Sequence, residues 1–276
     1  MTNYFKLFLL AIFAAQPFYT AVWAKTPAPA VAVNKTQAAT LAGLTARVRI
    51  EAAQNTVPTV IFDLDDTTFD SRYKRLMIIR DFISQPAVAS AYPAETAKIK
   101  PALDKLETVK TSMKETMYAL GVSNPDFISE AGKFSNGRIM SEWYLSRETA
   151  VAGAPAYING LYNAGARIVY ISARGTAMRS GTENALRANN LLLGKPRVAL
   201  YLNERDEEVV GYKARVLNEV RKSGKVIGGF ENEPENINMF KNMFPDGFMF
   251  FLNTRKSSNT PLSPGITVIN NYLRAR

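Results

Sequence analysis

The amino-acid sequence predicts an α/β fold: a Rossmann-like parallel sheet flanked by helices, with a helical insertion between the first two core strands. Short runs of β-branched and aromatic residues alternate with stretches of helical length, and these runs are apolar along their whole length. Strands of this kind are typical of a parallel sheet that is covered on both faces. The alternation breaks between residues 71 and 150, where no convincing strand occurs, and this segment is the predicted insertion.

The first 24 residues predict a cleaved secretory signal peptide. Lys6 precedes an apolar run over 7–15, and the small residues that end at Ala24 suit a signal peptidase. The run is well short of the roughly 20 residues that a membrane-spanning helix needs. We therefore expect a mature chain that begins at Lys25, has no membrane span and is periplasmic or secreted.

The remaining chain predicts one core and one insertion. A spacer and an N-terminal helix are expected over 25–54, and the core over 55–70 and 151–276. The strands expected in the core are 57–62, 166–171, 197–201, 225–228 and 247–251. The helices expected between the later strands are 176–190, 207–221 and 234–244. The insertion, 71–150, is expected to hold helical stretches at 97–120 and 127–144 and a Pro/Ala-rich patch near 86–93.

Composition excludes several kinds of site. The chain has 34 Lys and Arg against 24 Asp and Glu, a net charge of +10, and neither Cys nor His. The lack of Cys excludes disulfides, thiol nucleophiles and iron–sulfur clusters, and the lack of His excludes Ser-His-Asp triads. Any metal must therefore be a hard cation held by oxygen ligands. The basic residues are scattered along the chain, so we expect attraction of anions but no nucleic-acid partner.

The clearest chemical signal is the segment 61–68, which reads Ile-Phe-Asp-Leu-Asp-Asp-Thr-Thr. Asp63 and Asp65 come just after an expected buried strand, so both can face one site at the carboxyl edge of the sheet. One carboxylate can attack an electrophile while the other transfers protons. Carboxylates grouped beside a phosphate require a cation, and oxygen ligands favour magnesium.

This segment resembles the first signature of the haloacid dehalogenase (HAD) superfamily in its phosphatase form, and three further signatures follow in order. Ser172 ends the second core strand, Lys213 lies on an expected helix, and Glu231 follows the next strand. The resemblance covers about residues 55–255, and 71–150 resembles the cap insertion of this superfamily. The export signal and the Ser-Ala-Arg segment at 172–174 are similar to its secreted acid phosphatases.

The resemblance implies an exported, magnesium-dependent phosphomonoesterase acting on a small phosphorylated metabolite. Asp63 would be the nucleophile that forms an aspartyl-phosphate, and Asp65 would be the general acid and base. The residues implied in phosphate binding are Thr67, Ser172, Ala173, Arg174 and Lys213, and Thr67 is also expected to hold the loop by hydrogen bonding. The magnesium ligands implied are Asp63, the backbone carbonyl of Asp65, Glu231 and, through a water molecule, Glu235.

Other functions stay open at this point. The fourth signature commonly has Asp where this chain has Glu, so Glu233 and Glu235 are alternative ligands to Glu231. A dehalogenase of the same fold has no use for Asp65, and export argues against a sugar-phosphate mutase. A non-catalytic protein that binds a phosphate ligand or a partner remains compatible with the sequence, because a fold does not determine a function.

Overall fold

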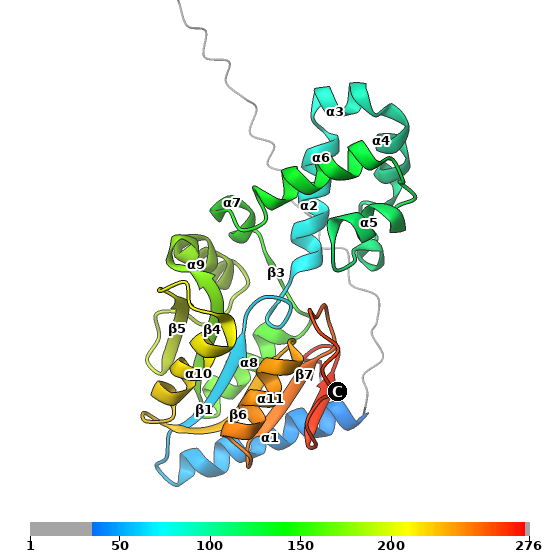
Figure 1. Ribbon diagram of the computed structural model, residues 1–276. Helices are drawn as coiled ribbons and strands as arrows, with labels where there is room; N and C mark the ends of the chain where they lie inside the picture. Colours follow the sequence, from blue (N-terminus) through cyan, green and yellow to red (C-terminus); the bar gives the residue numbers. More distant parts are fainter. Residues whose placement is uncertain (1–34, 274–276) are drawn as a thin grey trace, which may run out of the picture. The chain divides into compact units, whose positions relative to one another are not determined.

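The computed structural model describes residues 35–273, and Figure 1 shows their arrangement. The predicted signal peptide and most of the predicted spacer lie outside the described residues. Helix α1 (Lys35–Ala53) precedes the first strand, as expected. Within residues 35–273, no helix is both long and apolar enough to cross a membrane.

The core is a six-stranded sheet in which every neighbouring pair of strands is parallel. Its spatial order is β5-β4-β1-β6-β7-β8. The strands are β1 (Pro58–Asp63), β4 (Arg167–Gly175), β5 (Val198–Asn203), β6 (Lys225–Glu231), β7 (Phe248–Leu252) and β8 (Ile266–Ile269). The predicted α/β fold class is thus confirmed.

Helices cover both faces of this sheet, and each face has its own hydrophobic cluster. Strand β1 shows the alternation: Val60 and Phe62 belong to one cluster and Ile61 to the other. The first cluster includes residues of α1, α8 (Ala154–Asn163) and α9 (Arg179–Ala188). The second includes residues of α10 (Val209–Val220) and α11 (Pro234–Met243). Apolar side chains therefore cover both faces of the sheet. This explains why the strand sequences are continuous apolar runs.

Close packing on the central strands depends on two features. The rings of Phe62, Phe230 and Phe250 stack across β1, β6 and β7, with centroids 4.7 and 4.5 Å apart. Gly229 lets α11 approach β6, because a Cβ at this position would lie 2.8 Å from the Phe240 ring. These contacts hold β6 against β1 and β7, and the last turn of α11 against β6.

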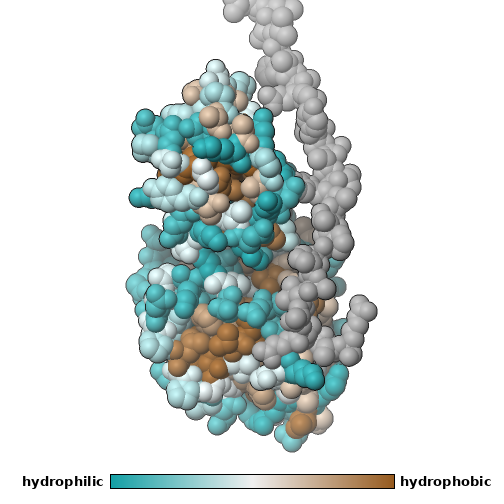
Figure 2. Space-filling view, turned by 90° about the vertical axis from the view of Figure 1, so that its right-hand side faces the viewer, coloured by the Kyte–Doolittle hydropathy of each residue, from teal (hydrophilic) through white to brown (hydrophobic). Residues whose placement is uncertain are grey.

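A helical insertion occupies the chain between β1 and β4. Its helices are α2 (Ser71–Ile83), α3 (Pro86–Ala91), α4 (Pro93–Ile99), α5 (Met113–Ala119), α6 (Pro125–Asn136) and α7 (Glu142–Leu145). They bury a separate cluster that includes Ile79, Phe82, Ile99 and Phe127. On the face shown in Figure 2, hydrophobic side chains gather at two levels, with hydrophilic side chains between them.

The insertion leaves and rejoins the core through a short antiparallel ribbon. Strand β2 (Phe69–Asp70) pairs with β3 (Thr149–Ala150), so that Asp70 lies opposite Thr149. The backbone N–H of Val151 also donates to the Thr68 carbonyl at 2.9 Å. The first and last residues of the insertion therefore both lie beside the loop that follows β1.

Some expected elements are wrong in their extent. The helical stretch expected at 97–120 is broken between α4 and α5, where Pro101 lacks the N–H that a continuing helix needs. The stretch expected at 127–144 divides at Gly137 into α6 and α7, and the Pro/Ala-rich patch forms α3 and the start of α4. Strand β4 runs three residues beyond Ser172, and β8 is an additional strand that the sequence pattern did not predict.

Candidate active site

The candidate site lies where the strand order reverses. The chain passes from β1 to β4 and β5 on one side, and then returns to β6 on the other side of β1. Asp63 is the last residue of β1, and Glu231 is the last residue of the neighbouring strand β6. Ligands of open α/β sheets bind at the carboxyl ends of the strands at such a reversal. The two carboxylates therefore lie where this architecture places a binding site.

The loop after β1 is held tightly by its own hydrogen bonds. The Leu64 carbonyl accepts backbone N–H groups of Thr67, Thr68 and Phe69 at 3.3, 2.9 and 2.8 Å. The Thr68 hydroxyl donates to the Asp63 carbonyl at 2.6 Å, and Asp66 takes a left-handed conformation with φ of 57°. The hydroxyl of Thr67 donates to Asn232 Oδ1 at 3.0 Å and so links this loop to the end of β6. The loop-holding role expected of Thr67 is shared with Thr68.

Lys213 joins the two buried carboxylates. Its Nζ, supplied by α10, donates to Asp63 Oδ1 and to Glu231 Oε1, both at 2.6 Å. All three residues are buried, with exposed fractions of 5% or less. The two carboxylates raise the pKa of Lys213 against the effect of its burial, so the ammonium stays charged. The resemblance to the third HAD signature implied Lys213, and the structure brings its ammonium into contact with both acids.

Glu231 uses both of its oxygens in hydrogen bonds with the protein. Oε1 accepts from Lys213 Nζ and from Asn236 Nδ2 at 2.6 Å, and Oε2 accepts the backbone N–H groups of Asn232 at 2.5 Å and Glu233 at 2.8 Å. Four donors thus surround a carboxylate with no exposed surface. A carboxylate has about four lone-pair positions, so the hydrogen-bonding capacity of Glu231 is filled.

Burial raises the pKa of Asp63 to about 8, and the charge of Glu231 acts in the same direction, while Lys213 opposes both. With all three groups ionised, Asp63, Glu231 and Lys213 would carry two negative charges against one positive charge. A proton or a bound cation at Asp63 would balance this excess.

Asp65 belongs to a second group of charges, which connects the core with the insertion. Arg174 binds the Asp65 carboxylate with two hydrogen bonds, from Nε at 2.8 Å and from Nη2 at 2.7 Å. Arg174 Nη2 and Lys74 Nζ also donate to Glu148, at 2.6 and 2.5 Å. The charge of Arg174 holds the pKa of Asp65 well below its usual range, although the partial burial of Asp65 acts in the opposite direction. Asp65 is therefore ionised in this arrangement.

The other predicted phosphate-binding residues lie near the same edge. Ser172 is buried on β4, one residue beyond Ile171, which pairs with Asp63. Its Oγ accepts the Arg174 backbone N–H at 3.4 Å. Ala173 is exposed, as expected from the alternation of side chains along β4. The structure joins Arg174 to Asp65, and the contact of Arg174 with phosphate stays a prediction.

Glu235 does not join the candidate site. Its side chain is exposed on the first turn of α11, where Oε1 accepts the hydroxyl of Thr260 at 3.2 Å. The neighbouring Asn236, not Glu235, points to Glu231. Because successive residues of a helix point about 100° apart, only one of the two can face Glu231. The predicted water-mediated ligand role of Glu235 therefore lacks a supporting contact.

A magnesium ion fits only part of the donor set. Across residues 35–273, no three acidic side chains are close enough together to hold a metal ion by themselves. Magnesium in phosphate-processing sites is commonly bound by one or two carboxylates, with water and substrate phosphate as further ligands. Asp63 and the backbone carbonyl of Asp65 meet that requirement. Glu231 could bind magnesium only if one of the four hydrogen bonds to its carboxylate were broken.

Several residues of this site carry no recognisable signal in the sequence. The charged partners Lys74 and Glu148 come from the two ends of the insertion, and no pattern links positions so far apart. Asn232 and Asn236 flank Glu231 closely, so their spacing is the one signal that could have identified them. Arg255, from the loop after β7, donates to Asp66 Oδ2 at 2.7 Å.

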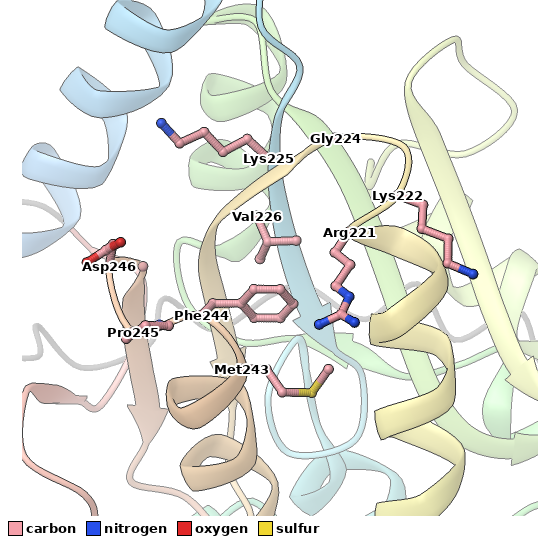
Figure 3. A pocket seen from close by; sticks show the side chains of 10 residues that line it. Arg221, Lys222, Gly224, Lys225, Val226, Met243, Phe244, Pro245 and Asp246 are labelled. Carbon is pink, nitrogen blue, oxygen red and sulfur yellow. The ribbon is translucent and has the colours of Figure 1, made fainter.

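A cavity of about 520 Å³ lies at the opposite edge of the sheet, near the start of β6. Figure 3 shows Arg221, Val226 and Phe244 pointing toward it, whereas Lys222 and Asp246 point away. None of the residues predicted for the active site lines this cavity. It is therefore separate from the carboxylate site.

Comparison with known proteins gives remote structural likenesses. No family model and no curated protein matches the chain. Among solved structures, the class C acid phosphatase of Bacillus anthracis with tungstate bound is 14% identical, with a TM-score of 0.42 and coverage of 80% of this chain and 78% of the other. A candidate phosphatase from Clostridium difficile is 14% identical, with a TM-score of 0.49 and coverage of 78% and 95%. A candidate HAD-hydrolase, YfnB, from Bacillus subtilis bound to magnesium is 13% identical, with a TM-score of 0.42 and coverage of 78% and 95%. These likenesses are too distant to support a conclusion about the chemistry of this chain.

Proposed function

We propose that this chain is an exported, magnesium-dependent phosphomonoesterase of the HAD type, which hydrolyses a small phosphorylated metabolite through an aspartyl-phosphate. The observation that carries the proposal is the placement of Asp63 at the carboxyl end of β1, hydrogen-bonded to Lys213 at 2.6 Å. Asp65 follows two residues later in the same rigid loop. A carboxylate beside a fixed ammonium suits attack on a phosphoryl group whose oxygens the ammonium can bind.

Each residue has one role in the proposed reaction. Asp63 attacks phosphorus in line, and the P–O bond to the leaving oxygen breaks as the aspartyl-phosphate forms. Asp65 protonates that leaving oxygen and later takes a proton from the water that hydrolyses the aspartyl-phosphate. Lys213 and Ser172 bind phosphoryl oxygens. Bound magnesium, held by Asp63 and the backbone carbonyl of Asp65, would neutralise the charge on those oxygens.

Arg174 fits both the binding and the proton-transfer steps. Its ion pair keeps Asp65 charged, which suits the step in which Asp65 acts as a base. A phosphate dianion that enters the site competes with Asp65 for the guanidinium, because Arg binds phosphate and carboxylate with the same bidentate geometry. Release from Arg174 lets Asp65 take up the proton that it donates to the leaving group.

Hydrolysis of an aryl phosphate by the purified protein, with magnesium and with a chelator, tests the proposal. We expect turnover that depends on magnesium and is lost in Asp63→Asn, because an amide is not a nucleophile. Asp246→Asn is the matched control, since Asp246 is exposed at the opposite edge of the sheet. Mass spectrometry after acid quenching should find the phosphoryl group on Asp63. Phosphate binding without turnover would instead favour the non-catalytic alternative.

The export part of the proposal rests on residues 1–24 of the sequence. We expect a mature N-terminus at Lys25 in protein isolated from the native host. N-terminal mass spectrometry measures this directly, and an intact Met1 in the cytoplasm would contradict export without affecting the proposed catalytic mechanism.

A further inference from the structure

One buried cation near the catalytic loop has no partner. Arg75 lies in the first half of α2 and is 9% exposed. Its Nε atom is buried and makes no hydrogen bond in the described part of the chain, and no ion pair to the guanidinium is found there either. Arginine stays protonated in proteins, and a buried charge without a partner is strongly destabilising. The position of Arg75 therefore calls for an anion that the protein itself does not supply.

Lys74, the preceding residue on α2, differs from Arg75 because it has acidic partners. Lys74 is also buried, but its Nζ pairs with Glu148 at 2.5 Å and lies 3.9 Å from Asp65 Oδ1. Because adjacent helical residues point about 100° apart, Lys74 and Arg75 contact different surroundings. Lys74 is directed to Asp65 and Glu148, whereas the charges that act on Arg75 are those of Arg255 and Asp66.

Arg255, the cation whose charge acts on Arg75, is already paired. Arg255 Nε donates to Asp66 Oδ2 at 2.7 Å, and the other oxygen of Asp66 accepts from Ser71 N and Oγ at 3.2 and 2.5 Å. The Asp66 carboxylate therefore has little capacity left for Arg75. Burial and the charge of Arg255 lower the pKa of Arg75, and the Asp66 carboxylate opposes them only in part.

The ion pairs beside the loop after β1 give the same result. The three carboxylates of Asp65, Asp66 and Glu148 are all engaged by Lys74, Arg174 and Arg255. Arg75 has no ion pair with any of them, although it lies close enough to Asp66 for that carboxylate to affect its pKa. Arg75 therefore lies beside the loop that carries Asp63 and Asp65, at the start of the insertion.

We propose that Arg75, assisted by Arg255, binds a second anionic group of the substrate, so that the preferred substrate is a phosphomonoester that carries another carboxylate or phosphate. This inference rests on the proposed phosphatase function and narrows its substrate class. The reacting phosphoryl group lies at Asp63, while the second anion lies against the first half of α2. A guanidinium with unsatisfied N–H donors suits an anion of planar or tetrahedral geometry equally well.

The test compares two pairs of substrates that differ in the second anion. The first pair is 3-phosphoglycerate and glycerol 3-phosphate, which differ by a carboxylate. The second pair is fructose 1,6-bisphosphate and fructose 6-phosphate, which differ by a phosphate. For each pair, kcat/KM is measured with the full mature protein and with Arg75→Gln, Arg75→Lys and Arg80→Gln. The ratio within a pair is the quantity compared, because partial misfolding lowers both members equally.

We expect the wild type to prefer the compound with two anionic groups in at least one pair. Arg75→Gln should lower that preference by about 10- to 100-fold, the usual value of a charged hydrogen bond. Arg75→Lys should keep part of it. Arg80→Gln, which removes a charge of the same helix that pairs with Asp104 at 3.3 Å, should keep all of it. A wild type without preference, or an unchanged ratio in Arg75→Gln, would overturn the proposal.

Binding separates this proposal from the phosphatase function. Calorimetric titration of the same compounds into Asp63→Asn, with and without Arg75→Gln, needs no turnover. An Arg75-dependent preference in binding, with no hydrolysis by the wild type, would support the anion site and refute the phosphatase proposal. Hydrolysis without any Arg75-dependent preference would support the phosphatase proposal and refute the anion site.

Discussion

Replacement of Glu231 by Gln tests whether this residue is an anchor for Lys213 or a metal ligand. The carboxylate accepts four hydrogen bonds with no exposed surface, from Lys213, Asn236 and two backbone N–H groups. Gln keeps one acceptor oxygen and places an NH₂ group where the other oxygen stood. Whichever way the amide is turned, two buried donors lose their acceptor.

The expected loss of stability follows from these contacts. Each buried donor left unsatisfied costs about 1–3 kcal/mol, so two of them cost about 2–6 kcal/mol. Breaking a buried ion pair by removing one partner costs about 3–5 kcal/mol in comparable proteins. The two estimates overlap, and we expect Glu231→Gln to lower the free energy of unfolding by about 3–5 kcal/mol.

Urea denaturation in the presence of a chelator measures this loss without any contribution from metal. Glu235→Gln is the matched control, because Glu235 is exposed and accepts one hydrogen bond from Thr260. We expect its effect to stay within about 0.5 kcal/mol. A loss below about 1 kcal/mol in Glu231→Gln, together with a raised magnesium requirement for activity, would refute the anchor role and assign Glu231 as a ligand.

Three further predictions concern the remaining acids. Burial raises the pKa of Asp63 to about 8, so the folded metal-free protein holds a proton that the unfolded chain loses near pH 4. The free energy of unfolding should then fall as pH rises from about 4 to about 8, and Asp63→Asn should reduce this slope in denaturation experiments with a chelator. Asp65→Asn should slow turnover by about 10²- to 10⁴-fold, and a change confined to KM would exclude an acid–base role. Glu148→Gln should lower the free energy of unfolding by about 3–5 kcal/mol, because Gln removes the negative charge that both Lys74 and Arg174 contact and leaves one of them without its acceptor, and an unchanged urea midpoint would contradict this.

The sequence predicts those parts of the site that follow from local pattern. An apolar strand that ends in Asp63 and a second acid at Asp65 could be read directly, because parallel strands bring their carboxyl ends to one edge. Lys213 and Glu231 were implied by the resemblance to the HAD signatures, which they match in order along the chain. Their contacts in the structure agree with that order, since Lys213 donates to both Asp63 and Glu231.

The parts that could not be predicted depend on contacts between distant segments. Glu148 pairs with Lys74 and with Arg174, and no periodicity connects these three positions. Arg174 was expected to bind phosphate, but whether it faces a ligand or Asp65 depends on the register between β1 and β4. Strand β8 was missed because its four residues follow a long irregular segment, and pairing with β7 determines its conformation.

The ribbon of β2 and β3 gives the insertion the character of an exchangeable cassette. Since Asp70 and Thr149 are paired, the ends of the insertion are adjacent whatever lies between them. The entropy of closing such a loop grows slowly with its length, so evolution can lengthen, shorten or replace the helices without disturbing the sheet. Any replacement changes one group of ion pairs. Glu148 and Lys74 come from the two ends of the cassette, whereas Arg174, which also pairs with Glu148, belongs to the core. A new cassette without an acid in the place of Glu148 would leave Arg174 with its pair to Asp65 alone, and this loss limits which helical domains the scaffold can accept.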